Sequence, residues 1–210
     1  MVKGIIFDLD GTLLNTIGDI HKVLNECLTA FGLENISVER CATLIGHGAK
    51  KLVQDAVCGE KWEDVYNLYA KKFSECENEL TALYEGEEEV LSELQRRGIK
   101  LAVVTNKPQR ATENVCRKLL SKFGFCVLFG QNGDYPLKPD PTATIKAVEI
   151  MGLKKSECIF FGDGEADVQT AKNAGLDCVS VLWGYRTKDQ LQTAGASAFA
   201  KSFPDILKFV

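Results

Sequence analysis

The sequence predicts an α/β protein in which an all-helical unit is inserted into a parallel β-sheet core. Two observations support this fold class. Short runs of consecutive apolar residues alternate with longer stretches of helical periodicity, which is typical of a parallel sheet with helices on both faces. The first two apolar runs are separated by roughly ninety residues, far more than a single crossover connection needs. The excess is therefore assigned to an insertion.

Five apolar runs are predicted to be buried strands of a Rossmann-like sheet. They cover residues 4–7, 99–104, 126–129, 158–161 and 178–182. Each run is apolar on successive residues rather than on alternate ones, as expected where helices cover both faces of the sheet. Because ligands of open parallel sheets bind beyond the carboxyl ends of the strands, the polar residues after these runs are the first candidates for a functional site.

The inserted unit is placed at residues 15–82, which leaves residues 1–14 and 83–210 for the core. Apolar side chains recur at helical spacing in two stretches of the insertion, residues 17–31 and 62–73. The aromatic side chains of the second stretch are expected to form the hydrophobic core of this unit rather than a stacking platform for a ligand. The insertion is therefore predicted to be all-helical.

Helices of the core are predicted from their end signals. An acidic run at residues 87–89 suits the positive end of a helix dipole. A proline in the first turn indicates a helix over residues 108–122, and Gly175 closes a helix that begins at residue 166. Residues 187–207 contain a further helix and short closing elements whose ends the pattern does not define.

Composition and charge argue against several classes of function. Apolar residues make up 45% and charged residues 26%, as in ordinary soluble proteins. The net charge of −4 gives no basic stripe, so no nucleic-acid partner is expected. No apolar stretch is long enough for a transmembrane helix, and the N-terminal run is too short for a signal peptide. A cytoplasmic protein without a membrane partner is predicted, and the oligomeric state is left open.

The eight cysteines are scattered along the chain without a CxxC pair, and there are only two histidines. A zinc site is therefore not expected. Several cysteines, Cys158 among them, lie within apolar runs. They are interpreted as buried free thiols in a reducing compartment.

The first polar segment after a predicted strand contains two carboxylates. Asp8 and Asp10 follow the run at residues 4–7 and precede the turn residue Gly11. Two like charges this close are unfavourable unless a cation compensates them, and Mg²⁺ prefers such oxygen ligands. A carboxylate can also act as a nucleophile in phosphoryl transfer. Taken alone, the segment would more often be a turn capped by aspartates.

A second acidic segment, residues 162–167, follows the fourth predicted strand. Asp163 stands at the strand end, where it suits a metal ion, and Asp167 falls in the first turn of the next helix, where it could hold a metal-bound water. Either residue could instead cap that helix. Four acidic groups at one edge of a sheet are costly without a cation, which favours the metal interpretation.

Two further segments contain groups that suit a phosphate. Thr105-Asn106-Lys107 follows the second predicted strand and offers a hydroxyl, an amide and backbone N–H groups near a helix start. Lys138 lies in a loop stiffened by prolines, where its ammonium could neutralise both a nucleophile and a phosphate oxygen. Taken alone, each segment would more often be a solvated loop.

The order and spacing of these four segments resemble the motifs of the haloacid dehalogenase superfamily. The matching residues are Asp8-Leu9-Asp10-Gly11-Thr12, Thr105, Lys138, and Gly162-Asp163 with Asp167, and they span nearly the whole chain. The insertion follows the first motif, as does the helical cap of that superfamily's first cap class, and it is called the cap below. Within the superfamily, the runs at residues 45–49 and 138–141 resemble the phosphoglycolate phosphatase branch.

The resemblance implies a Mg²⁺-dependent phosphatase that acts on a small phosphorylated metabolite, with phosphoglycolate as the first candidate. It implies that Asp8 attacks phosphorus and forms an aspartyl-phosphate. Asp10 would protonate the leaving oxygen and later deprotonate the water that hydrolyses this intermediate. Such chemistry depends mainly on positioning and on charge stabilisation.

The remaining ligands are assigned by the same resemblance. Mg²⁺ would be held by the Asp8 carboxylate, by Asp10 through its backbone carbonyl, and by Asp163, with Asp167 on a metal-bound water. The transferring phosphate oxygens would be held by Thr105, by Asn106 through its backbone, and by Lys138.

The cap tripeptide Gly46-His47-Gly48 is the candidate for substrate specificity. His47 could face the leaving group, or the tripeptide could be a surface loop with two flexible glycines, and the two interpretations are about equally supported. Asn15 and Glu85 depart from the family's usual residues near the cap hinges. Neither position performs chemistry in the family, so both bear on cap geometry.

Three other functions are kept as alternatives. A phosphomutase or a pyrophosphatase would use the same core, and a phosphate-binding or regulatory domain would use the same fold without turnover. Every predicted catalytic position is filled, which favours an enzyme. A dehalogenase is disfavoured because its reaction needs no metal, which would leave Asp10 and Asp163 unexplained.

Overall fold

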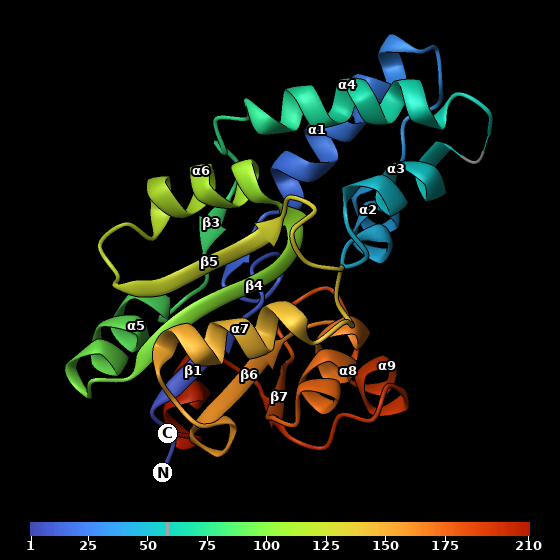
Figure 1. The fold of residues 1–210 in the computed structure, drawn as a ribbon. Coiled ribbons are helices and arrows are strands. Elements are labelled where there is room, and N and C mark those ends of the chain that lie inside the picture. Colours follow the sequence, from blue (N-terminus) through green and yellow to red (C-terminus); the bar gives the residue numbers. More distant parts are fainter. Residues whose placement is uncertain (58) are drawn as a thin grey trace.

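A six-stranded parallel sheet forms the centre of the protein (Figure 1). The structure is a computed structural model that describes residues 1–57 and 59–210. The strand order is β5-β4-β1-β6-β7-β8, and every neighbouring pair is parallel. The strands are β1 (Gly4–Phe7), β4 (Lys100–Pro108), β5 (Phe125–Gln131), β6 (Cys158–Gly162), β7 (Asp177–Val181) and β8 (Phe199–Ala200). The α/β fold class is confirmed. The five predicted strands are present, and the two-residue β8 is an additional edge strand. The prediction that all five are buried is wrong for β5, because it lies at the other edge of the sheet, where its side chains are half-buried or exposed.

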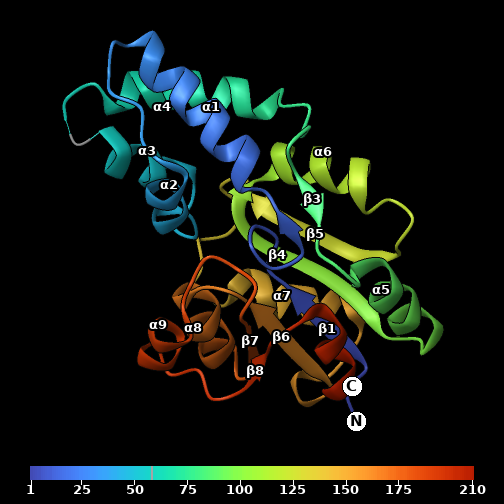
Figure 2. The same ribbon diagram turned by 180° about the vertical axis from the view of Figure 1, so that it is seen from behind.

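Helices cover both faces of this sheet (Figure 2). They are α5 (Glu87–Arg96), α6 (Gln109–Leu119), α7 (Thr142–Met151), α8 (Glu165–Ala174) and α9 (Lys188–Thr193), with the short 3₁₀ helices η1 (Lys155–Glu157) and η2 (Phe203–Lys208). Ile5 and Phe7 of β1 pack in one cluster with α5, α6 and η2. Ile6 packs on the opposite face with α7 and α8. This two-sided burial is why β1 is apolar at every position.

The helix ends differ slightly from the sequence prediction. α6 begins at Gln109, because Pro108 has φ −52° and ψ 137° and still belongs to the extended strand β4. α8 ends at Gly175, as predicted, and the glycine has the positive φ of 73° that favours this residue at a helix end. Helix α7 has no counterpart among the predicted elements. Among the described residues, no helix combines the length and apolar character that a membrane crossing needs.

Within the described residues, the cap consists of four helices with an apolar core of their own. They are α1 (Ile17–Ala30), α2 (Val38–Leu44), α3 (Ala49–Val57) and α4 (Trp62–Ser74). Tyr69 is buried in this core, and Tyr66 packs against it. Trp62 is half-buried, with the Lys50 ammonium 5.2 Å from the centre of its ring.

Two short antiparallel strands join the cap to the core. β2 (Leu14–Asn15) pairs with β3 (Ala82–Leu83) where the chain leaves the core and where it returns. The buried carboxylate of Asp19 in α1 accepts hydrogen bonds from Leu80 N (3.1 Å) and Thr81 Oγ1 (2.6 Å), which ties the two crossings together. The cap lies over the end of the sheet opposite to the two chain termini (Figure 1).

The cysteines that the structure describes are free thiols. Those that are buried are Cys27, Cys41, Cys116 and Cys158, whereas Cys76 and Cys178 are half-buried and Cys126 is exposed. Cys58 lies outside the described residues. The prediction of free thiols is therefore confirmed for the described cysteines, but burial applies to only part of them.

Candidate active site

Asp8 lies at the carboxyl end of β1, directly beneath the cap. Its backbone N–H donates to Phe161 O of β6 (2.9 Å), so the end of the sheet fixes its position. The side chain is 9% exposed, and its Oδ1 lies 2.8 Å from the Lys138 ammonium. This ion pair is the one close polar contact of Oδ1 among the described residues. A buried carboxylate oxygen is thus open to a further cationic partner.

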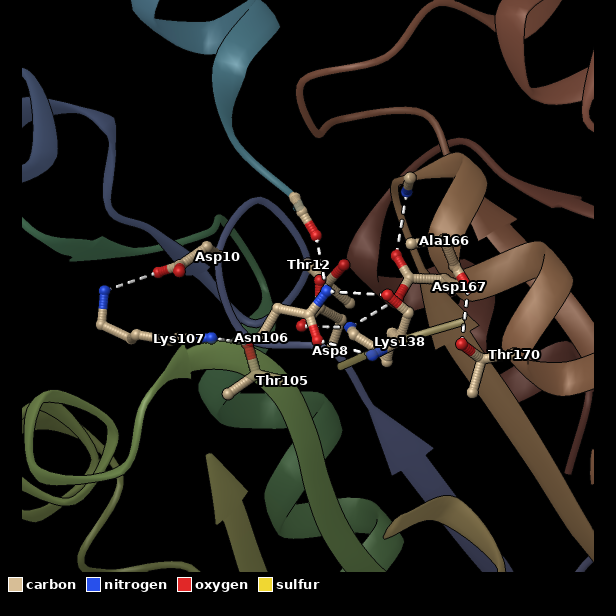
Figure 3. A network of polar contacts seen from close by, with 12 residues as sticks. Asp8, Asp10, Thr12, Thr105, Asn106, Lys107, Lys138, Ala166, Asp167 and Thr170 are labelled. Atoms are coloured by element: carbon tan, nitrogen blue, oxygen red, sulfur yellow. Dashed lines mark hydrogen bonds and ion pairs between the residues drawn. The ribbon is translucent and has the colours of Figure 1, made fainter. Parts of the chain in front are cut away.

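Two more carboxylates stand beside Asp8. Asp163 follows β6 and accepts hydrogen bonds from Thr12 Oγ1 (3.1 Å) and from Tyr185 N (2.8 Å). Asp167, in the first turn of α8, accepts from Gly164 N (2.9 Å), and its other oxygen lies 2.6 Å from Lys138 Nζ. Ligand atoms of Asp8, Asp163 and Asp167 all lie within 4.8 Å of one another. The sheet edge therefore brings together the acidic groups of two distant segments (Figure 3).

The electrostatics of the cluster are unfavourable for three ionised carboxylates. Burial, and then the charge of Asp167, raises the pKa of Asp8 to about 6, although Lys138 acts in the opposite direction. Burial, followed by the charges of Asp167 and Asp8, raises the pKa of Asp163 to about 8. Burial lowers the pKa of Lys138, but its two carboxylate partners outweigh that effect and raise it above the usual range. A single ammonium thus leaves the cluster short of positive charge.

Gly11 is required where the chain passes close to this cluster. Its φ is +85°, and a Cβ at this position would lie 2.4 Å from Asp163 Oδ2. The turn after Asp10 therefore needs glycine for two reasons, the left-handed backbone and the close approach of a carboxylate.

The predicted phosphate-binding residues lie next to Asp8. Thr105 is 7% exposed, and its hydroxyl accepts a hydrogen bond from Lys107 N (3.3 Å). The Asn106 side chain accepts from Lys138 N (2.8 Å) and donates to Lys138 O (3.2 Å), which fixes the lysine backbone. It also donates to Gly46 O of the cap (2.8 Å). Asn106 thus contributes a side-chain role that the sequence analysis does not include.

The Asp10 side chain is outside the carboxylate cluster. Figure 3 shows it directed toward Lys107 and away from Asp8. Its Oδ1 lies 2.9 Å from Lys107 Nζ, and the lysine side chain is 1% exposed. Lys107 was expected only as part of the segment Thr105-Asn106-Lys107, without a partner of its own. In the sequence Lys107 is visible only as the third polar residue after a predicted strand, and the direction of its side chain becomes known only from the fold.

Arg186 is a functional candidate that the sequence analysis misses. It lies between β7 and α9, is 9% exposed, and reaches across to the end of cap helix α2. The guanidinium donates to Ala42 O (3.0 Å) and Ile45 O (2.7 Å) of the cap, and its Nε donates to Glu165 of the core (3.0 Å). A cation suits the carbonyls at the C-terminal end of a helix. Arg186 therefore fastens the cap to the core.

Two small cavities reach Asp8 and Asp10 below the cap. One, of about 40 Å³, is lined by Gly46 and Gly48 together with polar and apolar residues of core and cap. The other, of about 10 Å³, is lined by His47. The structure thus brings all three residues of the predicted specificity segment to the site: Gly46 lines both cavities, Gly48 lines the larger one and His47 the smaller one.

A buried carboxylate beside an ammonium, at the ends of parallel strands and under a helical cap, is a site whose chemistry suits a hydrolase with a carboxylate nucleophile. The chain belongs to the haloacid dehalogenase-like hydrolases, since the model of that family matches residues 5–181. Within this family it is a hydrolase of phosphoric monoesters in the branch of the phosphoglycolate phosphatases.

Individual relatives support that assignment. A phosphoglycolate phosphatase of Pseudomonas syringae pv. tomato is 32% identical over 197 residues, covering 87% of this chain and 70% of the relative. One of Aquifex aeolicus is 31% identical over 184 residues, covering 88% and 86%. A candidate phosphoglycolate phosphatase of Lactobacillus delbrueckii subsp. bulgaricus has a crystal structure that matches with a TM-score of 0.92 at 26% identity, covering 99% of this chain and 97% of that one.

Proposed function

We propose that the protein is a Mg²⁺-dependent phosphatase that hydrolyses a small phosphate monoester, with phosphoglycolate as the first candidate, through an aspartyl-phosphate on Asp8. The observation that carries this proposal is the cluster of Asp8, Asp163 and Asp167 at the edge of the sheet, in which Lys138 pairs with Asp8 and Asp167. The relatives named phosphoglycolate phosphatases support the choice of substrate.

The donor set fits Mg²⁺. Three carboxylates converge, Lys138 supplies one positive charge, and Asp8 Oδ1 accepts no hydrogen bond from the described residues. Mg²⁺ favours oxygen ligands and keeps several waters, so few protein ligands suffice. Asp8 and Asp163 would hold it, with the Asp10 backbone carbonyl, and Asp167 would hold one of its waters. When bound, it would neutralise charge on the phosphoryl oxygens.

The chain's own residues then perform two displacements. Asp8 attacks phosphorus, and an acyl phosphate bond forms as the ester P–O bond breaks. Lys138 and Thr105 lie where they can stabilise the charge of the transferring oxygens. Asp10 gives a proton to the leaving oxygen in the first step. In the second it takes a proton from the attacking water, which releases phosphate and restores the Asp8 carboxylate.

The size of the cavity favours a small leaving group. Its volume of about 40 Å³ is a few times the roughly 10–15 Å³ that a cavity needs to hold one water molecule. Its cap side is apolar, through side chains such as Ile20, Leu52 and Phe73. A leaving group of a few atoms fits this closed arrangement, whereas a nucleotide or a sugar needs the cap to move.

A substrate panel tests the proposed function. The wild-type chain is assayed with phosphoglycolate, an aryl phosphate, pyrophosphate and a hexose bisphosphate, each with Mg²⁺ and with a chelator in its place. We expect Mg²⁺-dependent phosphate release that is fastest with phosphoglycolate, and an acid-quenched protein that carries a phosphoryl group on the peptide containing Asp8. Phosphate release without Mg²⁺, or faster isomerisation of the hexose bisphosphate than hydrolysis, would contradict the proposal.

A further inference from the structure

The Lys107 ammonium is a buried cation that the proposed steps leave without a task. It lies 2.9 Å from Asp10 Oδ1, and 4.4 Å from the centre of the Phe73 ring in cap helix α4. Side-chain exposure is 1% for Lys107 and 12% for Asp10. In Figure 3 the ion pair lies on the other side of Asp8 from Lys138 and Asp167. The proposed general acid therefore faces a lysine rather than the nucleophile.

The larger cavity connects this lysine with the nucleophile. Asp8, Asp10, Thr105 and Lys107 all line it, and Phe73 closes it from the cap. Among its lining residues, all of which belong to the described part of the chain, Lys107 is the one that carries a positive charge. A phosphate ester with its phosphorus at Asp8 extends its leaving group into this space. An anionic group on that leaving group would meet the Lys107 ammonium.

We propose that Lys107 binds a carboxylate on the leaving group of the substrate, and that this exchange frees Asp10 to turn toward the leaving oxygen. The inference rests on the proposed phosphatase function and narrows the substrate class to phosphate esters of small hydroxy acids. Lys107 is thus a specificity-determining residue, and for Asp10 it is a positioning residue. The exchange replaces one ion pair by another, and the released Asp10 carboxylate takes up one proton from solvent, which it then gives to the leaving oxygen.

The surroundings explain why an exchange is favoured over a simple loss of the ion pair. A buried ammonium without a carboxylate is costly, so Asp10 serves as its partner in the substrate-free protein. The apolar side chains that the cap contributes to the cavity lower the local dielectric and strengthen whichever ion pair forms there. A substrate without a carboxylate leaves Lys107 paired with Asp10, and the general acid then stays turned away.

The test compares two substrates in two variants and a control. Phosphoglycolate and ethyl phosphate differ by a carboxylate, and both are assayed with the wild type, Lys107→Met and Lys107→Arg. Lys122→Met is the matched control, because that lysine is 53% exposed on the surface. We expect Lys107→Met to lower kcat/KM for phosphoglycolate at least about 10-fold more than for ethyl phosphate, as is typical of a lost charged hydrogen bond. Lys107→Arg is expected to recover part of the loss.

Separate readouts distinguish the two halves of the inference. In an Asp8→Asn background, which stops turnover, Lys107→Met should weaken binding of phosphoglycolate but not of ethyl phosphate. The ratio of kcat for phosphoglycolate to kcat for ethyl phosphate, measured at saturation, should fall in Lys107→Met, because only the first substrate releases Asp10. A change confined to KM would overturn the role of Lys107 in positioning Asp10.

Two outcomes overturn the inference as a whole. Equal losses on both substrates would mean that Lys107 only supports the structure, and would leave the phosphatase function intact. A wild type that hydrolyses ethyl phosphate but not phosphoglycolate would exclude recognition of the carboxylate. A wild type that hydrolyses neither substrate with Mg²⁺ present would instead contradict the proposed function on which the inference rests.

Discussion

Glu87 gives the clearest prediction about stability, because a carboxyl group is buried where α5 begins. The residue is fully buried, its Oε2 accepts a hydrogen bond from Tyr84 N (3.0 Å), and its Oε1 has no hydrogen-bond partner among the described residues. Burial raises its pKa to about 8, against the opposing effect of the Tyr84 hydrogen bond. The folded protein therefore holds this proton at neutral pH, whereas the unfolded chain releases it near pH 4.5.

The sign of the effect follows from this difference in proton binding. Between pH 4.5 and about 8 the unfolded chain binds fewer protons at Glu87 than the folded protein, so rising pH favours unfolding. Each pH unit in this window costs at most about 1.4 kcal/mol. The shift from 4.5 to about 8 sets an upper limit of about 5 kcal/mol, and relaxation of the buried site reduces this to about 2–4 kcal/mol.

Glu87→Gln removes the titration and tests this reasoning. Urea unfolding is measured at pH 5, 6, 7 and 8 for the wild type, for Glu87→Gln and for Glu88→Gln. We expect Glu87→Gln to gain free energy of unfolding relative to the wild type as pH rises, by about 2–4 kcal/mol at pH 8. The control Glu88 pairs with Lys122 on the surface and should change stability by less than about 1 kcal/mol. Parallel curves for the wild type and Glu87→Gln would refute the buried-acid argument.

Three further changes test the site. Asp8→Asn should lower turnover at least about 10³-fold without loss of fold by circular dichroism, whereas the control Asp134→Asn, at an exposed position, should keep normal turnover. Normal turnover in Asp8→Asn would show that Asp8 is not the nucleophile. Lys138→Met leaves the buried carboxylates of Asp8 and Asp167 without their ammonium partner. It should lower the free energy of unfolding by about 3 kcal/mol or more, and Mg²⁺ should restore part of this stability in thermal melts. An unchanged free energy of unfolding would show that these ion pairs do not stabilise the protein. Arg186→Gln removes hydrogen bonds to the cap. It should raise KM several-fold and speed proteolysis at the junction of cap and core. An unchanged rate of digestion would show that another contact holds the cap.

The strands and the acidic segments are predictable from the sequence because their signals are local. Four of the five predicted strands are mostly buried on both faces, so their apolar runs are continuous and visible without the rest of the fold. The fifth, the edge strand β5, is only half-buried. Asp8 and Asp163 follow such runs directly, and parallel strands place their carboxyl ends at one edge. This geometry brings residues more than 150 positions apart into one cluster. Helix α7 was missed because it follows a proline-rich loop and has a weakly amphipathic sequence.

Contacts that depend on the path of loops were not predictable. Arg186 lies in a loop after β7, and its partners are backbone carbonyls of a different domain, which carry no sequence signature. Lys107 was visible as a residue but not as a partner of Asp10, since the direction of a side chain at a strand end depends on the twist of the sheet. The hydrogen bond from the Asn106 side chain to Gly46 O of the cap was equally unpredictable, because its acceptor is also a backbone carbonyl in a distant loop.

The Asn106 side chain has a consequence for how substrate preference could change in this protein. One amide bonds both to the cap loop at Gly46 and to the backbone of Lys138, so the lysine that faces the nucleophile is held by the same group that meets the cap. A displacement of the cap loop is therefore transmitted to the ammonium through a single side chain. Sequence variation in that loop would therefore change the rate of the chemical step as well as the fit of the ligand.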